Sequence, residues 1–465
     1  STDAYSDDLG VTLTGGAGVS VSGSVTRLAA GQSDGSALSI GYSGSTGAAG
    51  AVSGTATLTY ASVGRVGTSL VDAVPVVGSG SVAVSGKVYR KAEVGVSGTS
   101  VNLGNVRLGG TVLGGSVTLS NVASTDGYSD DLGLVFGAGS NGFTLSGGSA
   151  RIAAGSGATV GVEFGGSTAT GGVKSGVLSV GVVSKGQVGS GLSDVNLSPV
   201  TLNVNATVYR PAVGVLGSTE VDLGSVREGG SFVAGTLSVK NEVAADAYSE
   251  KLNARLGVAS GLVVKGSGAV SMLEAGATNA TELTVGLSGA GTAGLKSGTV
   301  RVDYETDGSG TSGLGVLGAG NQTVSVSGKV YRLAVGSAPG SVSLGAVREG
   351  DVFAPVKLSV GNTATADGYS DDLGVTLSGG TDVSVSGSVA RLAAGQSNGT
   401  ALSIGYSGAT AAAGAVSGVA TVGYVSKGQV GTGFADAVPV VGSGSVLVSG
   451  KVYRKAEVGV SGTSV

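Results

Sequence analysis

Apolar side chains alternate with small polar side chains along most of the chain, and glycine-rich turns separate the alternating runs. In residues 213–333 the alternation is clear at Leu283, Val285 and Leu287. Successive side chains of a β-strand point to opposite faces, so this period of two predicts strands with one buried face. The pattern predicts strands at residues 221–226, 232–240, 252–256, 262–264, 283–287, 300–304 and 324–331, with Val233, Leu237 and Val239 sharing a buried face.

The alternating pattern repeats along the chain. Residues 1–101 return without a gap as residues 365–465, at a constant offset of 364, and 80 of the 101 aligned positions are identical. A finer repeat is marked by the tripeptide Val-Tyr-Arg, whose tyrosines are spaced by 120, 122 and 122 residues: Tyr89, Tyr209, Tyr331 and Tyr453. The repeating unit is therefore about 121 residues, and the offset of 364 corresponds to three units.

Each unit has the size of a domain that can close its own core. Seven or eight alternating runs per unit predict a two-sheet sandwich. The same inward positions recur in the other units, at Leu38/Ile40/Tyr42, Val160/Val162/Phe164 and Leu402/Ile404/Tyr406. We expect a thin, valine-rich core and domains at residues 1–91, 92–212, 213–333 and 334–455, with 456–465 as the first strand of a further domain.

The composition supports strands and limits the chemistry. The chain has 91 glycines, 6 prolines, and neither cysteine, histidine nor tryptophan. Disulfides and catalytic sites built on histidine or cysteine are therefore impossible, and we expect no enzyme and no cofactor other than calcium. The net charge is −4, and the charged residues of both signs are scattered along the chain without a basic patch, so we expect no nucleic acid as a partner. We also expect no small-molecule substrate.

An ordered set of motifs recurs in the units. It runs Val-x-Leu-Gly-x-Val-Arg-x-Gly, Leu-Ser-Val-x-Asn, Asp-Gly/Ala-Tyr-Ser-Asp/Glu-x-Leu, Leu-x-Ala-Gly and a closing Val-Ser-Gly-x-Val-Tyr-Arg. This set resembles the bacterial choice-of-anchor D modules, relatives of the ASPM–SPD-2–Hydin group of immunoglobulin-like domains. The resemblance covers essentially all 465 residues. It implies an all-β fold of tandem immunoglobulin-like β-sandwiches on a secreted or surface-attached bacterial protein, with no catalytic residues.

The connectors between units are short, which predicts that the sandwiches form an extended, stiff rod. The tyrosine and arginine of each Val-Tyr-Arg would then lie at interdomain junctions: Tyr89, Arg90, Tyr209, Arg210, Tyr331, Arg332, Tyr453 and Arg454. In one interpretation the ring packs on the neighbouring domain and the guanidinium binds its carboxylates. In the other, the tyrosine covers the core of its own domain.

An acidic loop recurs beside the Tyr-Ser motif. It contains Asp126, Asp130 and Asp131 in one unit and Asp367, Asp371 and Asp372 in another. Carboxylates this close together could bind calcium, which prefers oxygen ligands. The alternative is a solvated turn in which Asp126 or Asp367 caps backbone N–H groups. In the third unit the pair is Glu250 and Lys251, and the lysine would repel a cation.

The two ends of the sequence match incomplete units. The first unit lacks counterparts of residues 92–123, which we expect to form two strands, and the tail from Glu457 repeats the start of a unit. One hypothesis is donor-strand assembly, in which Val458, Val460 and Val465 of one molecule complete the first sandwich of the next. The other is a longer continuous chain.

These observations predict a structural protein of an extracellular bacterial filament or surface rod with a three-domain higher period. Its partner would be itself, and membrane anchoring would depend on regions outside this segment. The alternative is an adhesin stalk or a glycan-binding cell-surface module. A binder would need a divergent domain rich in aromatic residues, whereas the chain has only 6 phenylalanines and 13 tyrosines.

Overall fold

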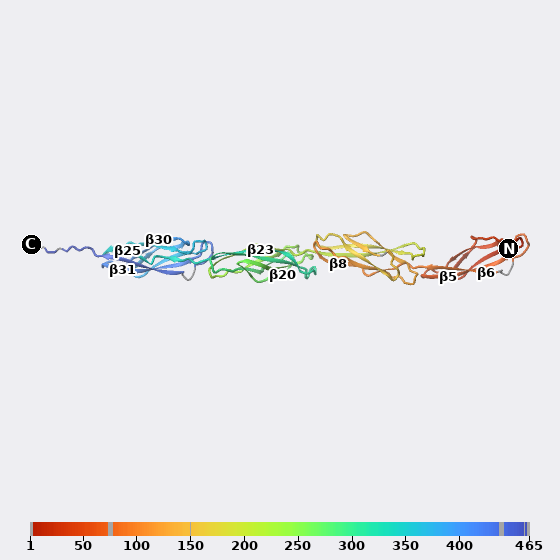
Figure 1. The fold of residues 1–465 in the computed structure, drawn as a ribbon, viewed down its shortest axis with the longest axis horizontal. Coiled ribbons are helices and arrows are strands. Elements are labelled where there is room, and N and C mark those ends of the chain that lie inside the picture. Colours follow the sequence, from red (N-terminus) through yellow and green to blue (C-terminus); the bar gives the residue numbers. More distant parts are fainter. Residues whose placement is uncertain (1–2, 73–77, 149, 437–440, 460, 463–465) are drawn as a thin grey trace. The chain divides into compact units, whose positions relative to one another are not determined.

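The computed structural model describes the chain except for residues 1–2, 73–77, 149, 437–440, 460 and 463–465. The described residues form β-strands and no helix (Figure 1). The chain divides into two compact units, residues 1–209 and 210–465. None of the described residues forms a helix with the length and apolarity needed to cross a membrane.

The first unit begins with a four-stranded sheet in the order β3-β1-β5-β6 and a separate pair, β2-β4. These strands are β1 (Asp8–Gly15), β2 (Val19–Ser22), β3 (Ser24–Leu28), β4 (Ser39–Tyr42), β5 (Gly50–Val63) and β6 (Gly78–Val88).

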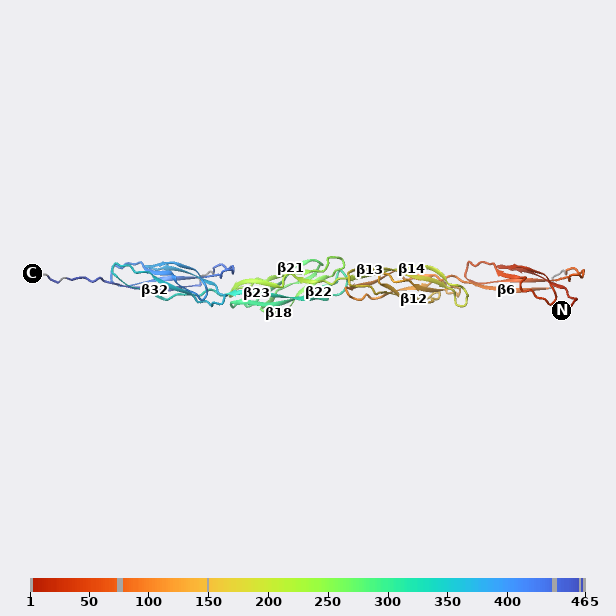
Figure 2. The same ribbon diagram turned by 90° about the horizontal axis from the view of Figure 1, so that it is seen from above.

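Two four-stranded sheets follow in the same unit, β10-β13-β14-β8 and β11-β12-β9-β7. The long strands β13 and β14 form the antiparallel centre of the first of them (Figure 2). The strands are β7 (Val94–Val96), β8 (Ser100–Arg107), β9 (Gly115–Asn121), β10 (Asp131–Phe136), β11 (Phe143–Gly147), β12 (Gly157–Phe164), β13 (Gly172–Lys185) and β14 (Val195–Tyr209).

The second unit contains two such pairs of sheets. The first pair is β16-β23-β22-β18-β20 with β15-β17-β21-β19, and the second is β25-β32-β31-β27-β29 with β24-β26-β30-β28. The first set is β15 (Gly214–Leu216), β16 (Glu220–Arg227), β17 (Gly235–Asn241), β18 (Lys251–Gly261), β19 (Val263–Lys265), β20 (Ala269–Leu273), β21 (Thr278–Leu287), β22 (Gly294–Asp307) and β23 (Leu317–Tyr331). The second set is β24 (Gly336–Ser337), β25 (Ser341–Arg348), β26 (Val356–Asn362), β27 (Asp372–Gly379), β28 (Val383–Ser386), β29 (Ser388–Leu392), β30 (Ser397–Tyr406), β31 (Gly414–Lys427) and β32 (Gly442–Tyr453).

One parallel ladder recurs in this architecture. The second strand of a sandwich pairs in parallel with its last strand, as β8 does with β14, β16 with β23 and β25 with β32. The ladders end on the same residue pair each time: Arg107 with Tyr209, Arg227 with Tyr331, and Arg348 with Tyr453. An arginine and a tyrosine therefore stand side by side at the end of each of these sandwiches.

The buried residues form three hydrophobic clusters, which extend from Ala92 to Val204, from Ala212 to Val326 and from Ala334 to Val452. In each cluster at least two of the three expected inward positions are buried, and Val160 and Val162, Leu283 and Val285, and Leu402 and Ile404 have no exposed surface. Phe164 and Tyr406 are only half-buried. In residues 1–91, Leu38 and Ile40 are half-buried and Tyr42 is 36% exposed. The predicted all-β fold of tandem immunoglobulin-like sandwiches is confirmed.

Three details differ from the sequence prediction. Val233 is 83% exposed because β17 begins only at Gly235, and Phe232 packs against the core instead. Residues 213–333 form nine strands, since the short strands β15 and β20 were not recognisable as alternating runs. Residues 92–123 contain three strands, β7, β8 and β9, and not two.

Candidate functional site at the repeated junctions

The backbone that follows each of the first three Val-Tyr segments is fixed to the Tyr-Ser loop of the sandwich that comes next in the chain. The Arg90 N–H donates to the Tyr128 carbonyl at 2.9 Å, and the Asp130 N–H donates to the Arg90 carbonyl at 3.0 Å. Arg210 makes the same two bonds with the loop at Tyr248 and Glu250, and Arg332 makes them with Tyr369 and Asp371. Each arginine thus forms an isolated parallel bridge with the loop serine.

The arginine side chain reinforces this backbone contact. Arg90 Nη1 lies 2.7 Å from Asp126 Oδ2, and the corresponding distances are 2.5 Å for Arg210 with Asp246 and 2.7 Å for Arg332 with Asp367. The aspartate also accepts the backbone N–H two residues later, at Tyr128, Tyr248 and Tyr369. Each aspartate therefore caps a backbone N–H group of its turn, as expected, and the same carboxylate also binds the arginine.

These contacts lower the pKa of all three aspartates. For Asp126 and Asp367 the main cause is the hydrogen bond from the arginine, followed by the tyrosine N–H. For Asp246 the Tyr248 N–H is the main cause of the lowered pKa. Donors that bind the charged carboxylate favour ionisation, and desolvation opposes them only in part.

A second acid of the loop is buried. The side chains of Asp130, Glu250 and Asp371 are covered, with 6%, 0% and 0% exposed surface. Each accepts a hydrogen bond from a hydroxyl on the long strand beside it, at 2.8 Å from Ser184, 2.7 Å from Thr306 and 2.8 Å from Ser426.

The same three hydroxyls accept the N–H of the alanine two residues after the arginine, each at 2.8 Å: Ala92, Ala212 and Ala334. The connector is therefore bound to the buried acid through one hydroxyl.

A buried asparagine at the end of the third strand completes this junction network. Asn362 Nδ2 donates to the carbonyls of Asp371 and Leu392, and its Oδ1 accepts the N–H groups of Val335 and Ala364. Asn121 and Asn241 occupy the same position and have no exposed surface. The Leu-Ser-Val-x-Asn motif pointed to this residue, but sequence reasoning gave it no role.

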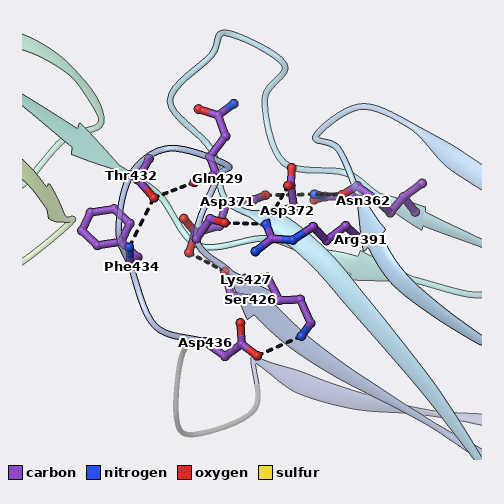
Figure 3. A network of polar contacts seen from close by, with 12 residues as sticks. Asn362, Asp371, Asp372, Arg391, Ser426, Lys427, Gln429, Thr432, Phe434 and Asp436 are labelled. Carbon is purple, nitrogen blue, oxygen red and sulfur yellow. Dashed lines mark hydrogen bonds and ion pairs between the residues drawn. The ribbon is translucent and has the colours of Figure 1, made fainter.

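In the second unit, the junction around Arg332 has a further contact, in which Arg227 of the preceding sandwich binds Asp371 and the loop that contains Phe434 and Ala435. Arg227 Nε lies 2.9 Å from Asp371 Oδ2, its Nη2 donates to the Ala435 carbonyl, and its guanidinium lies 4.8 Å from the centre of the Phe434 ring. Figure 3 shows Phe434 on the loop that leads from Lys427 to Asp436, near Asp371 and Ser426. Tyr331 packs against both Phe434 and Tyr369, with ring centres 5.6 and 5.9 Å apart.

The other junction residues predicted from the sequence vary in their surroundings. Tyr89 packs on Tyr128 with ring centres 6.1 Å apart. Tyr209 ends β14 beside Arg107. Tyr453 is 56% exposed, and the exposed Arg454 approaches Glu349 at 3.8 Å.

The carboxylates considered for calcium do not converge on one point. Asp126 and Asp367 bind arginines of the connectors, whereas Asp131 binds Arg151 at 2.7 Å and Asp372 binds Arg391 at 3.0 Å. Asp130 and Asp371 point inward to serines. Within the described part of the chain no group of three or more acidic side chains could hold a metal ion. The structure therefore provides no support for a calcium site among these residues.

The tail considered as a donor strand is only partly visible. Val458 is 90% exposed, and Val460 and Val465 lie outside the described residues.

Sequence reasoning missed the hydroxyls Ser184, Thr306 and Ser426, as well as Arg227 and Phe434. A weak signal for two of them was the recurring Val-Ser-Lys at residues 183–185 and 425–427. Arg227 was visible only as the last letter of a Val-Arg motif, because its partner Asp371 is 144 residues away.

No family model matches the chain, and no curated protein matches it. Among solved structures it is similar to extracellular cadherin domains 1–5 of protocadherin gamma B2, with 10% identity, a TM-score of 0.39, and coverage of 96% of this chain and 74% of that one. The human desmocollin-1 ectodomain gives 9% identity and a TM-score of 0.30, covering 97% and 75%. A mouse cadherin-23 segment, EC22-24, gives 10% identity and a TM-score of 0.31, covering 78% and 100%.

Proposed function

We propose that this chain is a structural module of an extracellular bacterial filament or surface rod, made of choice-of-anchor D-like sandwiches that are locked to each other at their junctions. The domains would be residues 1–91, 92–212, 213–333 and 334–455, followed by the first strand of another domain at 456–465. The observation that carries the proposal is the junction network, which recurs with the same geometry at Arg90, Arg210 and Arg332.

The proposal is supported by the hydrogen bonds that the buried polar side chains make at the junctions. Buried polar side chains cost stability unless every group is bonded, so fully satisfied networks fix one arrangement. Here the asparagine, the buried acid and the hydroxyl all bind backbone or side chains of the connector and the loop. The Oδ1 atoms of Asp130 and Asp371 are buried without a hydrogen-bond partner, so the network is nearly but not fully satisfied. Within each of the two compact units, a connector held by this many bonds would transmit orientation from one sandwich to the next and would not act as a flexible tether.

Self-association is the second part of the proposal. Residues 1–101 and 365–465 share 80 of 101 residues, so the same surface would return every three domains. A lateral or helical contact repeated at that period would bring identical surfaces together. Negative-stain electron microscopy of native material, with a denaturing gel, tests this: long fibres with an axial repeat of three domains support it. Isolated short rods would refute it and favour the adhesin stalk.

The contribution of the connector arginines to holding the sandwiches can be tested with matched variants. One variant carries Arg90→Ala, Arg210→Ala and Arg332→Ala, which remove the three connector ion pairs. The control carries Arg27→Ala, Arg151→Ala and Arg391→Ala, which remove three arginine–aspartate pairs inside single sandwiches.

Small-angle X-ray scattering should show increased flexibility in the first variant only. Identical scattering from both variants and the unmodified chain would refute the lock.

A further inference from the structure

Three corresponding turns of the chain have the same hydrogen bonds but different residues. Asn398 Oδ1 accepts the N–H groups of Thr400 and Ala401 at 3.0 and 2.9 Å, and Asn279 Oδ1 accepts those of the two corresponding residues, each at 3.2 Å. In the duplicate repeat, Asp34 stands at the position of Asn398 and accepts two N–H groups in the same way, each at 2.9 Å. An amide and a carboxylate therefore both serve as the cap of this turn.

The turn at Asn398 lies in an irregular part of the sheet. The register of β26 and β30 shifts between Leu358 and Val360, so that residues 399–401 stand opposite a single residue of β26. The other neighbour, β28, pairs with β30 only from Ser403 onward. Gly399 is exposed, and its backbone is therefore held less firmly than that of a residue paired within the sheet.

Nothing in the backbone requires a glycine at position 399. Apart from its two chain neighbours, the closest atom to a Cβ built there is Ser359 Oγ at 3.8 Å, and Ala280 takes the corresponding position in the third unit. The other Asn-Gly pair differs, because Gly142 has a φ of 85° and its Cβ would lie 2.6 Å from Gly166 Cα. The consequence of glycine at 399 is chemical, since the nitrogen that follows the asparagine is not crowded by a side chain.

These features allow the Gly399 nitrogen to attack Cγ of Asn398. The N–H groups of Thr400 and Ala401 bind Oδ1, the atom on which negative charge develops during the attack. The new bond between nitrogen and Cγ closes a cyclic imide. The bond between Cγ and Nδ2 breaks, and Nδ2 leaves as ammonia with the proton of the Gly399 N–H. Water then opens the imide, giving aspartate by attack at Cγ and isoaspartate by attack at the main-chain carbonyl carbon.

We propose that Asn398 is a deamidation site, at which the chain converts its own amide into a carboxylate and needs only water as a co-reactant. Conversion to aspartate gives the last unit the Ser-Asp-Gly sequence that the duplicate has around Asp34. The turn accepts this product, because the N–H groups of Ser36 and then Ala37 bind Asp34 and lower the pKa of its carboxyl group. The reaction therefore adds a negative charge to the last sandwich and keeps the hydrogen bonds of the turn.

The test is incubation of the folded, unmodified chain in mildly alkaline buffer, followed by peptide mass spectrometry that distinguishes aspartate from isoaspartate. Asn398 should lose its amide at least ~10-fold faster than Asn279, which has the same turn but is followed by alanine. Gly399→Ala should slow the reaction at Asn398 to the rate of Asn279, and Ala280→Gly should raise Asn279 to the rate of Asn398. Equal rates at the two asparagines of the unmodified chain, or no effect of Gly399→Ala, would refute the site.

A second comparison separates the effect of the fold from that of the Asn-Gly dipeptide. Asn141 also precedes a glycine, but its Nδ2 donates to the Ser175 carbonyl at 2.9 Å, in a turn closed by two backbone hydrogen bonds between Ser140 and Phe143. In the folded chain Asn141 should react at least ~10-fold more slowly than Asn398, whereas in concentrated urea the two rates should be equal. The proposal is overturned if Asn141 reacts as fast as Asn398 in the folded chain, or if both react only in urea.

Discussion

Replacing Asn362 by alanine should destabilise the last sandwich strongly, since one side chain satisfies four backbone groups. Its amide lies 3.1 Å from the carbonyls of both Asp371 and Leu392, and its oxygen lies 3.2 Å from the N–H groups of both Val335 and Ala364. The residue is 1% exposed, so these groups are not in contact with bulk water in the folded chain.

The magnitude follows from the cost of unsatisfied buried groups. A buried donor or acceptor that loses its partner costs about 1–3 kcal/mol. Carbonyls can retain a second hydrogen bond, so we count the two N–H groups in full and expect a loss of about 4 kcal/mol in the free energy of unfolding. The matched control is Asn398→Ala, which removes a partly exposed asparagine that caps the N–H groups of Thr400 and Ala401 and should cost about 1 kcal/mol or less.

Urea unfolding followed by far-ultraviolet circular dichroism provides the assay, and hydrogen exchange of β27 and β31 assigns the transition to the last sandwich. Sandwiches in one chain can unfold separately, so a single global transition should not be assumed. Equal losses for Asn362→Ala and Asn398→Ala would refute the reasoning, because the buried network would then contribute no more than an ordinary turn.

Three further predictions follow from the same contacts. Burial raises the pKa of Tyr304 to about 12, so the neutral phenol stabilises the fold below pH 10 and this contribution disappears as the pH rises through 12, which ultraviolet titration of the phenol and alkaline unfolding should show together. The lowered pKa of Asp367 means that its pair with Arg332 stabilises the fold above about pH 4 and is lost as the pH falls further; the difference in thermal midpoint between the unmodified chain and Arg332→Met should shrink there, and a constant difference would contradict it. Phe434→Leu should cost about 1 kcal/mol through loss of the ring under Arg227, in addition to the loss of its contact with Tyr331, and a urea titration of Phe434→Leu in an Arg227→Met background should show a cost smaller by about that amount.

The sequence predicted what depends on local periodicity. The alternation at Leu283 and Val285 identified buried strand positions, because a strand with one covered face must alternate. Recurrence of Val-Tyr-Arg identified Arg90 and its equivalents as positions of interest, although it could not distinguish a contact with the next loop from a cover over the tyrosine's own core.

Contacts between distant segments could not be predicted in this way. Asp130 and Asp131 look alike in the sequence, but successive strand residues face opposite sides, so one is buried against Ser184 and the other binds Arg151 at the surface. In the third unit the sequence showed the pair Glu250 and Lys251, and only the repulsion of a cation by the lysine was inferred from it. Glu250 takes the position of the buried aspartate, and its longer side chain reaches Thr306 and Ser312.

The parallel ladder at the end of each sandwich has a mechanical consequence. β16 and β23 are joined by six residue pairs and run in the same direction. Tension that pulls β16 toward its amino end and β23 toward its carboxyl end makes these strands slide past each other, so the six pairs resist together. The antiparallel hairpin of β22 and β23, pulled from its open end, would separate one pair after another. A pull along the chain therefore loads the six pairs of this ladder together and not one after another.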